Sequence, residues 1–474
     1  MPDDDVPDTT GLFGGVFARG GAGPDDTAWL QAMLDAEAGL ARALERAGLV
    51  PAGAGEAVTA AARAEDFDPN ELGQLASLTG NPVPGLARAL ARRVPQSAAG
   101  TVHRGATSQD IMDTAAMLVA RRATGVILAD LGVAAAAAAG LADAHRSTIM
   151  IGRTLLQQAV PVTFGLVAAG WMTGLDEARE GLAAVRDRRL AVQFGGAAGT
   201  LASLGTDGPR VAALLAGELG LALPALPWHT DRLRIIDLGS ALARVTAALG
   251  KIARDVTLLA QSEVGEVSEG GAEGQAAGAG QEAGASPRRG GSSAMPNKNN
   301  PVAAIAILGC ARQLPGLLAT LVSSAEQEHQ RAAGAWHAEW EPLTAMLRLA
   351  GSAASWGADL LTGLGVDSSR MAANLNATKG LPLAEHVASL LAGVLGGTQA
   401  HDLVAGAAAR AVSAGLPLQD VLLSVAGLEE RLSAAGIAPE QIESALDPSG
   451  YLGAAGTFVA AALQAHEALE VPNG

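Results

Sequence analysis

The chain has 474 residues, enough to bury a large core and to divide into two or three domains. Its formal net charge of −16 leaves no basic surface for nucleic acid. Its one cysteine, Cys310, excludes an intramolecular disulfide framework and a multi-thiolate metal site, and we expect a buried, inert thiol. The N-terminus carries acids where a signal peptide needs bases, and no apolar stretch is convincing as a membrane-spanning helix. We therefore expect a soluble cytoplasmic protein.

Most of the chain is predicted to be helical, because its apolar residues are mainly Ala, Leu and Val, and aromatic residues make up only 3 %. The first long helical pattern begins at Asp25. A second stripe over 127–141 and a sustained heptad seam over 238–259 predict long helices that pack on other helices. A further helix should follow Pro301 to about residue 328, with a kink or break at Pro315. We find no alternating strand pattern of useful length.

The chain is divided here into three domains. An N-terminal helical domain is expected over 1–107 and a central helical-bundle domain over 108–364. Residues 266–291, rich in Gly and Ala, cannot build a core and are predicted to be a mobile loop. Shorter helices separated by Gly-Leu-Pro turns predict a small helical domain over 365–474.

The most specific segment is 291–301, Gly-Ser-Ser-Ala-Met-Pro-Asn-Lys-Asn-Asn-Pro. It carries two hydroxyls, a cation and an amide toward a helix start. Lys298 can neutralise a carboxylate, while Asn300 and Pro301 suit the N-cap and the first helical position. The alternative is a Gly/Ser linker before a capped helix. That alternative would be favoured for a lone Gly-Ser-Ser, but the eleven residues together are far more specific.

A second polar segment, 102–110, contains His103, Thr107, Ser108 and Asp110 at a loop-to-helix junction. Ser108 is a candidate N-cap, and Asp110 would lie in the first helical turn. Ordinary capping is the alternative interpretation. Capping does not require the neighbouring His103 and Thr107, so we regard this segment as a candidate binding site.

A third segment, 152–165, places the donors Arg153, Thr154 and Gln157 among apolar residues. Such donors bind carboxylates well where water is scarce. Because an unpaired buried Arg is costly, Arg153 must meet either a ligand or an acidic side chain. The residues alone leave these two alternatives equally open.

A fourth segment, 327–340, contains His329 and His337, together with Arg331, Glu and Trp residues. The two histidines are spaced for one helical face, so a metal site has to be considered. A His-Glu-x-x-His pattern and a carboxylate-rich cluster are both missing. We therefore predict polar packing around a substrate pocket and no metal.

These segments together resemble, in order and spacing, the signature regions of the fumarase/aspartase superfamily. The segment 291–301 resembles its Gly-Ser-Ser-x-Met-Pro-x-Lys-x-Asn-Pro motif. Gly-Gly-Ala-Ala-Gly-Thr-Leu at 195–201 and Trp-His-Ala-Glu-Trp at 336–340 are most similar to bacterial 3-carboxy-cis,cis-muconate cycloisomerases. The resemblance implies an all-α fold of three helical domains with a central long-helix bundle. It also implies a homotetramer whose active sites combine segments from three subunits, a small polyanionic carboxylate substrate, and no cofactor or metal.

The resemblance further implies roles for individual residues. Ser292, the first serine of the signature, would be the acid/base of the reaction, and His103 and Lys298 would act with it. The residues implied to hold the substrate are Thr107, Ser108, Arg153, Thr154, Gln157, Ser293, Met295, Asn300 and Arg331.

Two positions depart from the family pattern. Leu155 stands where fumarases and adenylosuccinate lyases carry a proton-transferring His, so a hydratase or purine lyase would lack a catalytic group. A cycloisomerase tolerates this loss, since its nucleophile is a carboxylate of the substrate. Asn297 replaces the His that is usual before the signature Lys in this branch, and the lid over 266–289 is longer than usual. Either departure would suit a changed substrate.

Three hypotheses follow. The first is a cycloisomerase that converts 3-carboxy-cis,cis-muconate to a carboxymuconolactone in the protocatechuate branch of the β-ketoadipate pathway. The second is a lyase that eliminates a leaving group from a substituted succinate, such as nitrosuccinate. The third is a catalytically silent helical scaffold, against which the intact Ser292, Lys298 and Asn300 argue.

Overall fold

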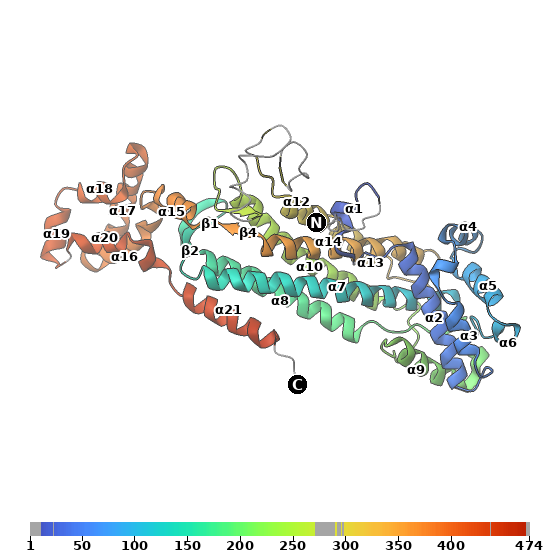
Figure 1. Cartoon of the computed structure of the whole chain (residues 1–474). Helices are drawn as coiled ribbons and strands as arrows, with labels where there is room; N and C mark the ends of the chain where they lie inside the picture. The colour runs from blue at the N-terminus through green and yellow to red at the C-terminus, as the bar shows by residue number, and fades with distance from the viewer. Residues whose placement is uncertain are drawn as a thin grey trace. The chain divides into compact units, whose positions relative to one another are not determined.

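The computed structural model describes residues 11–21, 23–270, 290–291, 295, 298–436 and 438–470. It is mostly helical, which confirms the predicted all-α class (Figure 1). The chain groups into two compact units, described separately below. The first comprises Met1–Val133, Leu175–Ala253 and Ala303–Asp359, and the second Ala134–Gly174, Arg254–Val302 and Leu360–Gly474. The division into three domains at residues 107 and 364 stays a prediction.

The first unit contains short helices near the N-terminus and parts of four long helices, α7, α8, α10 and α14, which contribute residues to both units. Its helices are α1 Gly14–Phe17, α2 Asp26–Arg46, α3 Ala54–Ala61, α4 Pro69–Thr79, α5 Val83–Arg93, α6 Gln96–Ala99, α7 Ser108–Ala144, α8 Phe164–Arg188, α9 Gly208–Leu219, α10 Leu233–Leu259, α12 Val302–Ala311, α13 Leu314–Ser323 and α14 Trp340–Thr362. Short 3-10 turns lie at Arg19–Gly21, Ala64–Asp66, Ala202–Asp207 and His337–Glu339.

Local sequence explains where these helices begin and which face they bury. Asp25 caps α2, since its carboxylate accepts a hydrogen bond from the Ala28 backbone N–H at 2.7 Å. The predicted heptad seam of α10 is buried from Leu238 to Leu259. A Cβ at Gly357 of α14 would lie only 2.4 Å from Leu249 of α10, so this glycine permits close packing of the two helices.

The second unit contains the strands and the C-terminal helices. Strands β1 Ile149–Thr154 and β2 Gln157–Thr163 form an antiparallel hairpin, and β3 Val267–Glu269 pairs with β4 Leu364–Val366. The helices that follow are α15 Ser368–Asn376, α16 Ala384–Leu395, α17 Gly397–Ala414, α18 Leu418–Leu423, α19 Leu428–Ala434, α20 Pro439–Ala445 and α21 Ala455–Glu470, with 3-10 turns at Leu381–Leu383 and Pro448–Tyr451. An apolar cluster centred on α16, α17 and α18 forms the core of the C-terminal part.

Several sequence expectations need correction. Strands are present, and the β1–β2 hairpin was missed because a register irregularity between Ile151 and Arg153 breaks its alternation. The predicted loop does not begin at residue 266, because Glu266 is buried and 267–269 form β3. The rest of that prediction, 271–289, lies outside the described residues. The helix after Pro301 ends at residue 323 and is interrupted at 312–313, before Pro315.

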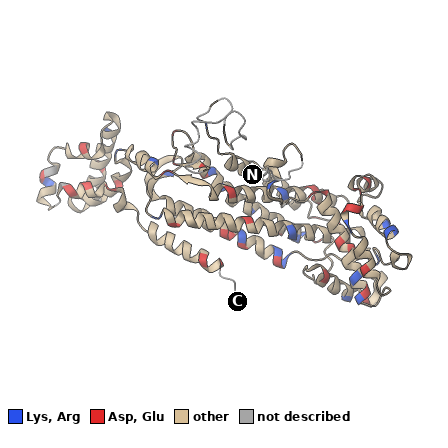
Figure 2. Cartoon of the chain, viewed as in Figure 1, with Lys and Arg blue, Asp and Glu red and all other residues tan. Residues whose placement is uncertain are grey.

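Two apolar helical stretches, Ser108–Ala144 and Val302–Ser323, are long enough by length and composition to cross a membrane. The second is interrupted between α12 and α13. The first buries Gln109, Asp110 and Asp113 near its start, where each contacts protein partners. Such buried, paired polar groups are typical of a core helix. Acidic and basic residues are interspersed along the helices (Figure 2).

Cys310 is buried, as expected, and burial raises the pKa of its thiol to about 12. The thiol therefore stays protonated at neutral pH and makes a poor nucleophile.

Candidate active site

The N-terminal end of α7, in the first unit, is organised by the buried side chain of Asp110. Its Oδ2 accepts hydrogen bonds from the backbone N–H groups of Thr107 and Gly196, at 3.0 and 2.9 Å. Its Oδ1 accepts from the Gly195 N–H at 3.0 Å and lies 2.7 Å from His229 Nε2. One carboxylate thus holds three segments of the chain at the helix start.

The helix start itself differs by one residue from the prediction. Ser108 is the first residue of α7, so Thr107, and not Ser108, occupies the N-cap place. Asp110 lies in the first turn, as predicted, and bonds back to the Thr107 N–H. Thr107 and Ser108 therefore both lie at a helix N-terminus, where backbone amides favour an anion.

His103, in the loop before α7, is held by the buried Glu37 of α2. His103 Nδ1 lies 2.6 Å from Glu37 Oε1, and the His103 backbone N–H donates to Glu37 Oε2 at 2.9 Å. Burial by itself would lower the pKa of His103. The hydrogen bond and charge of Glu37, with the charge of Asp110, outweigh burial and raise that pKa above its ordinary value. His103 therefore stays cationic to a higher pH than a free histidine.

Arg331 contributes a second cation to this region. Its guanidinium donates to Gln109 Oε1 at 2.8 Å and to the carbonyl oxygens of Gly196 and Ala197 at 3.3 and 2.8 Å. Within the described part of the chain, all three acceptors are neutral and no carboxylate pairs with it. A guanidinium oriented by neutral acceptors keeps its charge available for a carboxylate ligand.

Beneath this region, Arg232 forms a buried ion-pair network. Its guanidinium contacts both oxygens of Asp113, at 2.8 and 2.9 Å, and Glu339 at 2.6 Å. Burial alone would lower the pKa of Arg232, but the two carboxylates outweigh it and raise that pKa. Trp336 Nε1 also donates to Asp113 Oδ1 at 3.0 Å. From the sequence, Trp336 and Glu339 were expected around a substrate pocket. In the structure, both side chains belong to this buried network.

The two histidines considered as metal ligands make other contacts. His337 Nε2 lies 3.0 Å from the carbonyl oxygen of Gly80, and the His329 carbonyl accepts a hydrogen bond from Thr230 at 3.1 Å. Across the described residues, no group of three or more His, Cys, Asp or Glu side chains is arranged to hold a metal ion.

In the second unit, Arg153 of β1 forms a bidentate ion pair with Glu266. The two N···O distances are 2.9 and 2.8 Å, and the buried Glu266 also accepts a hydrogen bond from Asn374 Nδ2 at 2.8 Å. Of the two alternatives that the residues left open, the structure therefore shows the ion pair. A contact between Arg153 and substrate stays a prediction.

The tip of the β1–β2 hairpin presents exposed residues in an unusual backbone conformation. Leu155 and Leu156 are 95 % and 74 % exposed, and both have positive φ values, 49° and 63°. Thr154 and Gln157 pair across the turn and are also exposed. A left-handed φ is costly for a non-glycine residue, so this tip stores strain at an apolar surface.

The signature segment is described only in part. Ser292 and Ser293 lie outside the described residues. Met295 and Lys298 are exposed, and the Lys298 backbone N–H donates to the Met295 carbonyl at 3.0 Å. The helix begins at Val302, so the predicted N-cap Asn300 lies one position further from the helix than expected.

The ends of the signature segment lie together. Gly291 pairs with Asn299, and the Asn300 backbone N–H donates to the Gly290 carbonyl at 2.8 Å. Gly290 has φ +81°, and a Cβ there would lie 2.6 Å from the Asn300 carbonyl oxygen. A glycine is therefore required where the two ends meet.

The first unit thus gathers His103, Thr107, Ser108 and Arg331 around the start of α7, while the second carries Arg153, Thr154 and Gln157 on the hairpin and Met295, Lys298 and Asn300 on the signature segment. Sequence reasoning missed Glu37. A signal was present, because Glu37 occupies the apolar stripe formed by Leu30, Leu34, Ala41 and Leu44 in α2. An acid on a buried helical face needs a partner.

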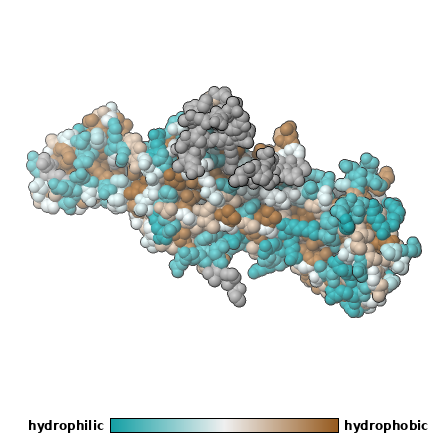
Figure 3. Space-filling view, viewed as in Figure 1, coloured by the Kyte–Doolittle hydropathy of each residue, from teal (hydrophilic) through white to brown (hydrophobic). Residues whose placement is uncertain are grey.

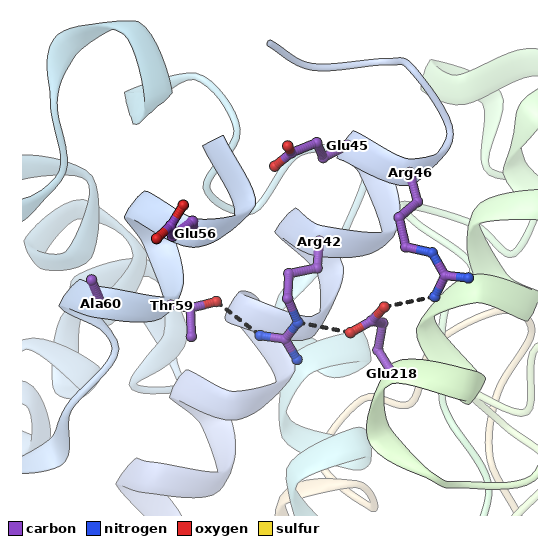
Figure 4. Close-up of a pocket in the computed structure, with 7 residues that line it drawn as sticks. All are labelled: Arg42, Glu45, Arg46, Glu56, Thr59, Ala60 and Glu218. Carbon is purple, nitrogen blue, oxygen red and sulfur yellow. Dashed lines mark hydrogen bonds and ion pairs between the residues drawn. The ribbon is translucent and has the colours of Figure 1, made fainter. Parts of the chain in front are cut away.

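A pocket of about 670 Å³ lies elsewhere in the first unit, among α2, α3 and α9 (Figure 4). Its cations Arg42 and Arg46 both pair with Glu218, each at 2.7 Å. None of its lining residues belongs to the four polar segments. Because its principal charges neutralise one another, we do not assign it a catalytic role.

Comparisons with known proteins identify the family of the chain. Residues 23–316 match the family described as "Lyase". The chain is 45 % identical over 447 residues to a 3-carboxy-cis,cis-muconate cycloisomerase of Pseudomonas aeruginosa, spanning 94 % of this chain and 93 % of that protein. It is 46 % identical over 445 residues to a nitrosuccinate lyase of Streptomyces davaonensis, spanning 92 % and 90 %.

The crystal structure of a 3-carboxy-cis,cis-muconate lactonizing enzyme from Pseudomonas putida matches with a TM-score of 0.86 at 40 % identity, over 96 % of this chain and 99 % of that one. Sequence signature, fold and relatives therefore agree: the chain belongs to the fumarase/aspartase family of lyases.

Proposed function

We propose that this enzyme converts 3-carboxy-cis,cis-muconate to a carboxymuconolactone. The observation that carries the proposal is Leu155, an exposed apolar residue at the position where other branches of the family place a proton-transferring histidine. A reaction whose nucleophile is already ionised needs no such base. The identity of 45 % to a relative named for this activity supports the proposal.

The proposed reaction closes a ring within the substrate and takes up one proton. One carboxylate oxygen adds to the β-carbon of a double bond conjugated to a second carboxylate, which forms the carbon–oxygen bond of a lactone. The π electrons of that double bond move into the second carboxylate. The α-carbon, which lies between the attacked β-carbon and the second carboxylate, then accepts a proton from Ser292. Cations aimed at the carboxylate where charge accumulates lower the barrier.

Three cations that would serve this reaction come from different parts of the chain. His103 and Arg331 supply positive charge at the start of α7, and Lys298 supplies it from the signature segment. Thr107 and Ser108 would add hydroxyl and backbone donors. Gln157, Thr154, Asn300, Ser293 and Met295 would complete the substrate contacts.

We further propose that the enzyme is a cytoplasmic homotetramer whose active sites combine segments of different subunits. Large apolar residues remain exposed on bundle helices, including Val133 of α7, Ile305 of α12 and Val322 of α13, each at least half exposed. Figure 3 shows brown, apolar surface among teal, polar surface in one view of the molecule. Contact with further copies of the chain would bury it.

A second candidate function is elimination from a substituted succinate with release of fumarate. The identity of 46 % to a relative named nitrosuccinate lyase favours it equally strongly. Ser292 would then remove a proton from the carbon next to a carboxylate, and the leaving group would depart from the neighbouring carbon.

The two reactions separate in one experiment. Purified protein is mixed with 3-carboxy-cis,cis-muconate, and loss of conjugated-diene absorbance is followed; nitrosuccinate is tested in parallel for nitrite release. We expect loss of the diene, and Ser292→Ala should reduce its rate by about 10²–10⁴. Ser147→Ala, an exposed serine, is the matched control. Nitrite release without diene loss would replace the proposed function by the second candidate.

A further inference from the structure

We propose that Glu37 is the positioning residue of His103: its buried carboxylate fixes the imidazole at the start of α7 and keeps it cationic during the reaction. The assignment of a role toward substrate rests on the proposed function. The coupling between the Glu37 and His103 side chains does not depend on the proposed function, and it can be measured separately.

The contact between the two residues has two points. One oxygen of Glu37 accepts the His103 backbone N–H at 2.9 Å, and the other lies 2.6 Å from Nδ1 of the same residue. The short distance is typical of a hydrogen bond between charged partners. Backbone and ring are thus both tied to one carboxylate, which leaves His103 little freedom to rotate.

Burial makes this contact selective for the charged imidazole. The Glu37 side chain is 1 % exposed and the His103 side chain 26 %. In the described part of the chain, both hydrogen bonds that the Glu37 carboxylate accepts come from His103. A buried carboxylate requires a positive partner, and His103 is the cation that contacts Glu37 of α2.

The backbone conformation of His103 indicates that the surrounding contacts force this residue into its position beside Glu37. Its φ is +59°, a left-handed value that is uncommon for residues other than glycine. Gly105, two residues later, has φ +82°, and a Cβ there would lie 2.7 Å from Leu204. Strain of this kind persists where surrounding contacts over-determine it, and it is concentrated at functional sites.

The charges that face His103 are few. Glu37 approaches from α2 and Asp110 from α7, while Leu204, which packs on Gly105, is apolar. Arg104, the neighbour in the chain, is exposed. Asp110 already bonds three backbone N–H groups and His229, so it acts on His103 through its charge alone. Both acids raise the pKa of His103, and burial opposes them.

The role of the His103 ring depends on which of its two nitrogens is already bound to Glu37. Nδ1 is bound to Glu37, so Nε2–H is the donor that remains for an anionic ligand. In the described part of the chain, Nε2 has no hydrogen-bond partner. Glu37 therefore sets the orientation and the charge with which His103 meets a substrate carboxylate.

The first test measures His103 directly. The ring signal of His103 is titrated by NMR in protein labelled at histidine and assigned with His103→Asn, which needs no substrate. The pKa should lie above that of a free histidine in the unmodified enzyme, and Glu37→Gln should lower it by about one unit or more. An unmodified His103 that titrates at or below the ordinary value would overturn the proposal, whether or not Glu37→Gln folds.

The second test uses the pH dependence of turnover. Without Glu37, only the charge of Asp110 opposes the effect of burial on the pKa of His103, so His103 should lose its proton at a lower pH than in the unmodified enzyme. Glu37→Gln should therefore shift the alkaline limb of the kcat profile to lower pH, and lowering the pH should restore part of the lost activity. Glu37→Asp, which keeps the charge, should keep the position of that limb.

A matched control distinguishes this role from a structural one. Glu218→Gln removes another ion-paired carboxylate, from the pocket of Figure 4, and should leave the pH profile unchanged. A uniform loss of activity in Glu37→Gln at every pH, with an unchanged His103 titration, contradicts the proposal. Absence of turnover in the unmodified enzyme would reject the proposed function and leave the titration to decide on Glu37.

Discussion

The start of α7 and the β1–β2 hairpin both carry residues that the family resemblance implies for substrate binding, yet they are built in opposite ways. At the start of α7, Asp110 and Glu37 are nearly fully buried and hold the loop and ring of His103 by several hydrogen bonds. On the hairpin, Thr154 and Gln157 flank two exposed leucines. The first region is organised before any ligand arrives, whereas the second offers surface that a ligand or another subunit must complete.

This contrast has a physical cause. Buried carboxylates select one arrangement of their donors, because any other arrangement leaves charge unpaired in a low-dielectric interior. An exposed hairpin tip experiences no such selection, since water satisfies its polar groups. Preorganised donors suit stabilisation of developing charge, and exposed elements suit substrate entry and closure.

The largest expected effect comes from breaking the network beneath the first region. Asp113→Ala removes two contacts of Arg232 and, among the described residues, leaves Glu339 as its remaining carboxylate partner. Losing one partner of a buried pair destabilises by about 3–5 kcal/mol. Thermal unfolding should show it as a large fall in Tm. Asp187→Ala, which breaks the exposed pair with Arg186, should cost about 0.5 kcal/mol or less. Equal effects of the two variants would contradict the distinction between buried and exposed charge on which the comparison of the two regions rests.

A smaller effect is expected from Arg331→Lys, which keeps the charge but removes the planar fork that donates to Gln109 and Ala197. The carboxylate contact weakens, and kcat/KM should fall by about ten- to a hundredfold, the equivalent of about 1.5–3 kcal/mol per charged hydrogen bond. Steady-state kinetics at limiting and saturating substrate concentrations measures kcat/KM and kcat. Unchanged kcat/KM would remove Arg331 from the substrate site.

The smallest effect concerns the hairpin tip. Replacing Leu155 by Asn and Leu156 by Gly supplies residues that adopt positive φ easily, so strain falls and the protein should gain about 1–2 kcal/mol of stability. A rise in Tm with reduced turnover would show that the strained leucines serve function. A rise in Tm with unchanged turnover would show that the tip does not touch the substrate.

Much of the fold and part of the site follow from local sequence alone. The heptad seam of α10, a helix beginning at about Asp25 and an interruption near Pro315 were predicted, and the structure confirms them. The family was also predicted, because its signature segments are contiguous strings. Helical periodicity and contiguous motifs are short-range properties, so they can be read without knowing which parts of the chain meet.

Only the tertiary structure shows which residues are the hydrogen-bond and ion-pair partners of the candidate site residues. Glu37 and His103 are 66 residues apart, and Arg331 bonds residues more than 130 positions away. The sequence offers 48 acids, and nothing local shows that Glu266 is the one that pairs with Arg153. The hairpin was missed for a related reason, since its strands are defined by pairing across a bulge rather than by alternation. Periodicity determined the helices and contiguous motifs indicated the family, because both are local properties of the sequence; long-range pairing of buried charge decided which of the candidate residues are held in place.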